Sequence, residues 1–249
     1  TGTVNTSVGV DSLTANTTGA SNTAVGQAAL EANTTASFNT GIGRNALGGN
    51  TTGANNTATG YNSLLANTTG ANNTAMGFSS LSANTTGTYN ISIGAYSMVT
   101  NTTGSNNVAM GQDALRLNTE SNNTAVGFLA LSANTTGTQN NAFGQAVLAS
   151  NTTGSYNSSF GRASMNVNTT GSYNVAMGVL ALDANTTASN NIAVGYLSLS
   201  ENTTGAGNAA LGKSAMAANT TGTNNTAVGH GALDANTTAD NNVAVGLNS

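Results

Sequence analysis

A unit of 17 residues repeats along the whole of this 249-residue chain. Its consensus is close to Asn-Thr-Thr-Gly-x-x-Asn-Thr-Ala-Val-Gly-x-x-Ala-Leu-x-Ala, and we number its residues as positions 1 to 17. A fixed short period is typical of solenoids and other stacked folds, so we expect residues 1–249 to form one repeat array. Position 1 falls at Asn16, Asn33, Asn50, Asn67, Asn84, Asn101 and Asn118, and then, one residue early, at Asn134, Asn151, Asn168, Asn185, Asn202, Asn219 and Asn236.

One coil of the array is short, with 16 residues at 118–133. The missing residue lies between Asn118 and Asn123. We expect it to be lost from a turn, because losing a residue inside a strand would reverse the face that points inward. The strands expected at 108–110 and 124–126 should then face the same way.

The composition excludes several classes of partner. The chain has four basic and eight acidic residues, a net charge of −4 and no cysteine. So few positive charges give no electrostatic footprint for nucleic acid or for an anionic membrane. No run of about 18 apolar residues is present that could insert into a bilayer. Without cysteine, a zinc or iron–sulfur site built on thiolates is excluded.

Two columns of the repeat never vary. Position 7 is Asn and position 11 is Gly in all fifteen copies. Glycine reaches positive φ without steric cost, and Asn tolerates the left-handed region better than most residues. Both columns therefore predict fixed turns between short strands. Examples are Asn22, Gly26, Asn73, Gly77, Asn107, Gly111, Asn174 and Gly178.

Two short strands are expected in each coil. Position 10 is apolar in every copy except Thr59, and position 8 is mostly Thr, Val or Ile, so we expect both on the inward face of the first strand. Position 15 is always Leu or Met, as at Leu30 and Met98, and should point inward from the second strand. The small residues at positions 9 and 14 either pack against a neighbouring chain or lie between the two sheets of one flattened coil.

These columns predict an all-β fold, a parallel β-solenoid or β-roll of about fifteen 17-residue coils. Helices are not expected, because Gly and Asn recur too often and the apolar spacing has period 2. Stacking of identical residues would let the Asn columns form amide ladders along the rod.

Short motifs in the repeat resemble those of a known family. They fit the Asn/Ser–apolar–small–apolar–Gly signature of YadA-type trimeric adhesin heads, and the NTTG-linked units are also similar to the repeats of phage tail-fibre proteins. The resemblance covers nearly the whole chain, although the Asn-Thr-Thr-Gly segment makes this unit longer than the usual adhesin-head repeat. The motifs are NTAVG at 22–26, NISIG at 90–94, NVAMG at 107–111 and NIAVG at 191–195.

The adhesin resemblance implies a left-handed parallel β-roll, with three chains side by side and a surface that binds matrix or host ligands. It also implies that positions 8 and 10, such as Ile91 and Ile93, point into each roll. Besides a homotrimer, a single-chain roll or a head-to-tail filament of copies stays open.

No enzyme, cofactor or metal site is expected. The single histidine, His230, has no recurrent acid near it in the sequence, and general acid–base catalysis needs positioned partners. We expect it to be a surface turn residue. A calcium β-roll would place an Asp at a fixed point of every turn, and the acids here form no column.

Position 12, directly after the fixed Gly, is the most informative variable column. Long, aromatic and cationic side chains in a row could bind glycans or a protein surface. They could equally shield the sheet edge or pack on a neighbouring chain. The aromatic residues Phe38, Tyr89, Tyr156 and Tyr173 at position 6 extend this surface. The candidate ligand-binding residues at position 12 are Arg44, Tyr61, Phe78, Phe128, Arg162, Tyr196, Lys213 and His230.

Asn-Thr-Thr is formally an acceptor for N-glycosylation. It occurs, for example, at Asn16, Asn50, Asn67, Asn84 and Asn101. The same residues are explained equally well by turn geometry, in which Asn and Thr side chains satisfy nearby backbone groups.

The sequence therefore predicts a self-associating structural segment of an extracellular fibre or adhesin head, at a cell or virion surface, that presents position 12 to a glycan or protein. The alternative is an ice-binding β-solenoid that uses ladders of Thr at positions 2 and 3. Adjacent Thr residues of a strand point to opposite faces, which weakens this alternative.

Overall fold

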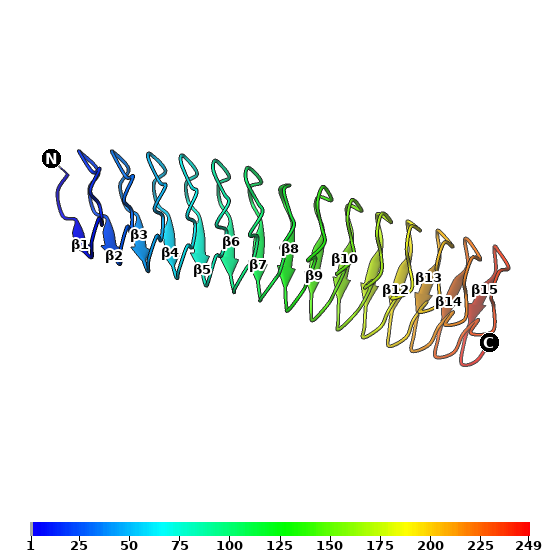
Figure 1. The fold of residues 1–249 in the computed structure, drawn as a ribbon. Coiled ribbons are helices and arrows are strands. Elements are labelled where there is room, and N and C mark those ends of the chain that lie inside the picture. The colour runs from blue at the N-terminus through cyan, green and yellow to red at the C-terminus, as the bar shows by residue number, and fades with distance from the viewer. Residues whose placement is uncertain (1) are drawn as a thin grey trace. The chain divides into compact units, whose positions relative to one another are not determined.

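The computed structural model describes residues 2–249 and confirms the predicted fold class. The chain forms a parallel β-solenoid with one three-residue strand per coil, and no helix occurs in the described part. The coils group into two compact units, Thr1–Asn123 and Thr124–Ser249. Within each unit the coils follow one another in chain order (Figure 1).

The strands are evenly spaced along both units. Unit 1 contains β1 (Thr6–Val8), β2 (Thr23–Val25), β3 (Thr40–Ile42), β4 (Thr57–Thr59), β5 (Thr74–Met76), β6 (Ile91–Ile93) and β7 (Val108–Met110). Unit 2 contains β8 (Thr124–Val126), β9 (Asn141–Phe143), β10 (Ser158–Phe160), β11 (Val175–Met177), β12 (Ile192–Val194), β13 (Ala209–Leu211), β14 (Thr226–Val228) and β15 (Val243–Val245).

Within each unit, neighbouring strands pair in parallel at a shift of one repeat. Thr40 lies opposite Thr57 in β3 and β4, for example, and Val175 lies opposite Ile192 in β11 and β12. Residues at the same repeat position therefore stack in columns along each unit. The columns inferred from the sequence are real columns of the structure.

The inward face of the strand is the reverse of the predicted one. The middle residue of the strand, at position 9, is buried, whereas positions 8 and 10 lie on the outer face. In β6, Ser92 is 0% exposed but Ile91 is 41% exposed. The expectation that Ile91 and Ile93 point into the coil is wrong.

The reason is the thinness of the coil. Positions 9 and 14 face each other across the interior, and Ser92 Oγ donates a hydrogen bond to the main-chain oxygen of Ser97 at 3.0 Å. Ala24 and Ala29 occupy the same two positions in another coil, and both are fully buried. The small columns therefore lie inside one flattened coil, where Val147 at position 14 is the largest side chain that either column holds.

The predicted second strand is also absent. Residues at positions 12 to 17 form turns, and the Leu or Met at position 15 has positive φ in the coils where it is described. Leu30, for example, has φ 52° and is fully buried. The left-handed conformation costs about 1–2 kcal/mol for a residue with a Cβ, and complete burial of a Leu side chain contributes roughly 1.5–3 kcal/mol. Position 15 thus points inward, as expected, but from a turn.

The Gly column at position 11 provides the turn after the strand. Gly26 has φ 134°, and a Cβ at this site would lie 2.6 Å from the carbonyl oxygen of Gly43 in the next coil. Both the dihedral angle and the space require glycine. Position 7 works differently: the positive φ lies one residue earlier, at Ser21 (57°) in the same coil, and not at Asn22.

The Asn residues at position 1 form a buried amide ladder. Asn50 Nδ2 donates to Asn33 Oδ1 of the preceding coil at 3.0 Å and to the carbonyl oxygen of Gly53 in its own coil at 2.9 Å. Asn67 Nδ2 in turn donates to Asn50 Oδ1 at 2.7 Å. Each amide thus uses both of its N–H groups, as a buried polar group must.

The Asn residues at position 7 form a second ladder that meets the first. Asn39 Nδ2 donates to the same Gly53 carbonyl oxygen at 2.9 Å, and Asn39 Oδ1 accepts the main-chain N–H of Asn56 at 2.9 Å. The carbonyl at position 4 therefore accepts one bond from each ladder. The expected amide ladders are confirmed, and they connect side chains to the main chain as well as to each other.

The short coil lacks a turn residue, as predicted. Asn118 Nδ2 and Asn107 Nδ2 both donate to the Glu120 carbonyl oxygen, at 2.6 and 2.8 Å, so Glu120 takes the place of the Gly at position 4. The middle residue is buried in β7 and also in β8, so both strands keep the same inward face. Asn101 Oδ1 is buried and accepts no hydrogen bond, so the position-1 ladder is interrupted after Asn101.

Replacing the inward Ala109 by Leu tests the assignment of the faces. We expect Ala109→Leu to lower the free energy of unfolding by roughly 1–3 kcal/mol, because the thin interior cannot accept the added volume. At protein concentrations where the chain is monomeric, Met110→Thr, on the outer face, should change it by less than about 0.5 kcal/mol. Chemical unfolding followed by circular dichroism measures both. A larger loss for Met110→Thr would mean that position 10 points inward.

Restoring the short coil should stabilise the protein. A variant with Thr inserted after Thr119, combined with Glu120→Gly, recreates Asn-Thr-Thr-Gly and offers Asn101 Oδ1 a donor. A buried polar atom without a partner costs about 1–3 kcal/mol, so a gain of this order is expected. The same unfolding measurement applies, with Glu120→Gly alone as the control. Equal stability of the two variants would show that the interrupted ladder carries no cost.

Candidate functional site

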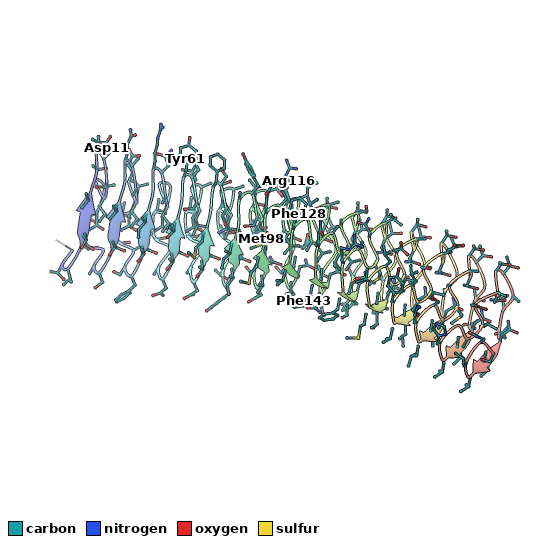
Figure 2. All side chains as sticks on the ribbon, turned by 90° about the horizontal axis from the view of Figure 1, so that it is seen from below. Asp11, Tyr61, Met98, Arg116, Phe128 and Phe143 are labelled. Atoms are coloured by element: carbon teal, nitrogen blue, oxygen red, sulfur yellow. The ribbon has the colours of Figure 1, made fainter. Side chains whose placement is uncertain are left out.

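The position-12 side chains project from the coils, and the eight candidate residues at this position are all exposed. In unit 1, three of them lie in consecutive coils. The Arg44 guanidinium lies 5.7 Å from the Tyr61 ring centre, and the rings of Tyr61 and Phe78 stack at 5.2 Å with 15° between their planes. Phe78 contacts Tyr96 edge-on at 5.2 Å. Figure 2 shows Tyr61 projecting outward, whereas Met98 lies within the coils.

This stacking limits what the row can bind. Tyr61 and Phe78 turn their ring faces toward each other along the stack, and Arg44 lies over Tyr61. The row thus presents mainly ring edges, the Tyr hydroxyl groups and the guanidinium to the outside. In unit 2, Tyr196, Lys213 and His230 occupy consecutive coils, while Phe128 and Arg162 have other residue types beside them in this column.

A second exposed surface was not predicted: the outer face of the sheet, formed by positions 8 and 10. Neither position carries a charged residue in any copy. In unit 2, the rings of Phe143 and Phe160 stack at 4.9 Å with 3° between their planes. Figure 2 shows Phe143 on the outside of its coil. Exposed members of this face include Ile42, Met76, Ile91, Met110, Phe143, Met177, Ile192, Leu211 and Val228.

One signal in the sequence points to this arrangement. Position 9 is Ser at only three sites, Ser7, Ser92 and Ser159, and position 14 is Ser in each of those coils. In the structure these pairs are hydrogen-bonded across the interior, as for Ser92 with Ser97. Every Ser at position 9 thus has a Ser at position 14, although position 14 is also Ser in four coils where position 9 is Ala. The hydrogen bonds establish that positions 9 and 14 face each other, and therefore that positions 8 and 10 face outward.

Position 6 forms a third exposed column, in which residues with a Cβ adopt positive φ. Tyr89 is 61% exposed, and the rings of Tyr156 and Tyr173 stack at 4.8 Å. Gln139 Nε2 lies 3.4 Å from the Tyr156 hydroxyl. The column also contains several exposed Asn residues.

The Asn residues of the Asn-Thr-Thr motif are not on the surface. Asn50, Asn67, Asn84 and Asn101 are 0% exposed, and the two N–H groups of their amides lie within the position-1 ladder. Asn16, in the second coil, is partly exposed. A glycan on the amide nitrogen would replace one of these N–H groups and occupy the interior. In the folded coils these residues are turn and ladder residues.

The carboxyl groups show two opposite environments. Burial raises the pKa of Asp183, a main-chain hydrogen bond partly opposes this, and the nearby Glu201 adds to the rise. Asp183 Oδ1 is buried and accepts no hydrogen bond. Hydrogen bonds from the main-chain nitrogen and Oγ1 of Thr223, at 2.6 and 2.9 Å, lower the pKa of Asp240.

Residues 2–249 contain no pocket and no group of three or more side chains suited to a metal ion. They also include no helix that is both long and apolar enough to cross a membrane. His230 is exposed at position 12, and the ion pair found in the described residues joins Arg116 Nε to Asp113 Oδ1 at 3.6 Å. The candidate binding features of the described residues are therefore the exposed columns at positions 6, 8, 10 and 12.

Comparison with protein-family models gives no match, and comparison with curated protein sequences gives none.

The environment of Asp183 predicts a pH effect. Because its folded pKa lies above the unfolded value, the folded state binds more protons, and the free energy of unfolding falls as the pH rises through this range. We expect Asp183→Asn to raise the midpoint of thermal unfolding at pH 7 and to have little effect at pH 3. Asp234→Asn, at the same repeat position but exposed, serves as the control. An equal gain from both variants would contradict a specific effect of burial.

Proposed function

We propose that this chain is a structural segment of an extracellular fibre or adhesin head, and that its copies associate side by side through the outer face of the sheet. The observation that carries this proposal is the pair of uncharged, largely apolar columns at positions 8 and 10. Within each unit the coils are bonded to one another by main-chain hydrogen bonds and by Asn ladders, with one interruption at Asn101, and this bonding supports the surface columns.

The extent of the face supports self-association. Seven strands at ~4.8 Å give an uncharged strip about 30 Å long in unit 1 alone. Its position-10 column is apolar except at Thr59, whereas its position-8 column is Thr in the first five strands. Soluble monomers rarely expose continuous apolar patches of more than a few hundred Å². A second copy has columns of the same spacing, so its side chains can fit between those of the first. This favours copies of the chain as the partner.

Lateral association is favoured over a head-to-tail filament. The strip runs parallel to the stacking direction, so only neighbours beside the coils can cover it, whereas a head-to-tail neighbour would cover a terminal coil. The resemblance of NTAVG and NISIG to trimeric adhesin heads favours three copies, and it also supports a location at a cell or virion surface. The position-12 row would then face outward, with Arg44, Tyr61 and Phe78 available to a glycan or protein.

The association state tests this proposal. We expect the purified chain to have the mass of an oligomer, most simply a trimer, by size exclusion with light scattering. Replacing Met76, Ile93 and Met110 together by Ser should give a monomer with an unchanged circular dichroism spectrum, because only apolar contact area is removed. The matched control is Tyr61→Ser with Phe78→Ser, which removes apolar area from position 12.

The proposal fails if the parent chain is a monomer at micromolar concentration. It also fails if the position-12 variant dissociates while the sheet-face variant stays associated, because position 12 would then be the interface.

Ice binding is a second candidate, carried by a different Thr column from the one predicted. At position 2, Thr51 Oγ1 donates to the main-chain oxygen of Thr68 at 2.9 Å, so this hydroxyl already has an acceptor in the next coil. On the outer face of β2–β4, however, Thr23, Thr40 and Thr57 stack in consecutive coils. Thermal hysteresis measured on the monomeric sheet-face variant and the parent would reveal such an activity.

A further inference from the structure

The Asn-x-Ser/Thr sequences of this chain fall into different structural environments. Those at position 1 are the Asn-Thr-Thr motifs. Three more lie in the position-7 ladder, where each Asn Nδ2 donates to a position-4 carbonyl oxygen: Asn5, Asn90 and Asn157. A third group lies at position 6, where the sequence is Asn-Asn-Thr and the Asn precedes the strand by two residues. The members of this group are Asn55, Asn72, Asn122 and Asn224.

Apart from the partly exposed Asn16 and Asn236 in the outer coils, the position-1 group is closed to modification in the folded coil. Asn67 is 0% exposed, and its Nδ2 donates to Asn50 Oδ1 at 2.7 Å and to the Gly70 carbonyl oxygen at 2.8 Å. An amide that carries a sugar keeps one N–H group and can satisfy only one of these acceptors. The sugar would also need a space that the adjacent coils, about 4.8 Å apart, do not leave.

The position-6 group is open. Asn55, Asn72 and Asn224 are exposed, and their side chains make no hydrogen bond to the part of the chain that the structure describes. Their main chain is nevertheless fixed: the N–H of Asn55 donates to the Ser37 oxygen at 3.2 Å, and that of Asn224 to the Ala206 oxygen at 3.0 Å. Substitution of the amide nitrogen therefore removes no hydrogen bond of the fold.

We propose that Asn55, Asn72, Asn122 and Asn224 are the N-glycosylation sites compatible with the folded solenoid. The donor would be a nucleotide-diphosphate sugar. The Asn Nδ2 forms a bond to the anomeric carbon of the sugar, the bond from that carbon to the diphosphate oxygen breaks with its electron pair leaving on the diphosphate, and the amide loses one proton. This inference stands independently of the proposed self-association, because it concerns folding of the single chain.

A soluble bacterial transferase that glucosylates Asn-x-Ser/Thr, produced together with the chain in the cytosol, provides the test. The soluble, protease-resistant chain is separated from the aggregated chain, and hexose-bearing peptides are mapped by mass spectrometry in both fractions. We expect the folded fraction to carry hexose at the four position-6 residues and none at Asn50, Asn67 or Asn84.

Variants at the strand position two residues downstream sharpen the test. Asn106 is an exposed position-6 residue followed by Asn107 and Val108, so it is not an acceptor. Val108→Thr makes it one, and we expect it to gain hexose in the folded fraction. Thr57→Val should remove hexose from Asn55 alone. Both changes exchange residues that the repeat already uses at position 8.

Hexose at Asn50, Asn67 or Asn84 in the folded fraction would overturn the proposal. So would a folded fraction without hexose at the four position-6 residues, whatever the aggregated chain carries.

Discussion

The carbonyl group at position 4, with the two Asn amides that donate to it, is the interaction on which the rest of the structure depends. In one coil, the Gly53 oxygen accepts Asn50 Nδ2 of its own coil and Asn39 Nδ2 of the preceding coil. Each Asn also bonds to its equivalent in a neighbouring coil, by side chain or by main chain. A shift by even one residue would leave several buried amides unpaired, so the ladders fix the register of the stack.

The ladders matter because the apolar core is small. A typical inner coil encloses one Leu or Met and two small residues, as Leu30 is enclosed with Ala24 and Ala29. So narrow an interior excludes the larger side chains of the strand, which lie on the outer face. The same constraint that keeps the coil thin therefore creates the uncharged apolar strip through which we propose that copies associate. The thin interior therefore explains both the small core and the exposed strip.

Part of the candidate surface could be predicted and part could not. The exposure of position 12 follows from its variability and its charged members, such as Arg44 and Lys213. The outer sheet face escaped prediction because alternation with period 2 shows only that Ile91 and Ile93 share a side, and hydrophobicity then assigns that side to the interior. The hydrogen bond between Ser92 and Ser97 places position 9, and not positions 8 and 10, on the inward side. The stacking of Tyr61 on Phe78 depends on coil spacing and side-chain rotamers, which no composition specifies.

The sequence by itself determined the period, the parallel stacking of equal positions, the Gly turn at position 11, the amide ladders and the place of the missing residue. These features follow from properties that a residue type has in any protein. Gly26 can adopt positive φ, and the Asn50 amide has two N–H donors and one oxygen acceptor. Tertiary structure decided which side of the strand faces inward and that Leu30 sits in a left-handed turn. The inward side of the strand and the left-handed turn both depend on the space inside a closed coil. That space is defined only once neighbouring coils have packed.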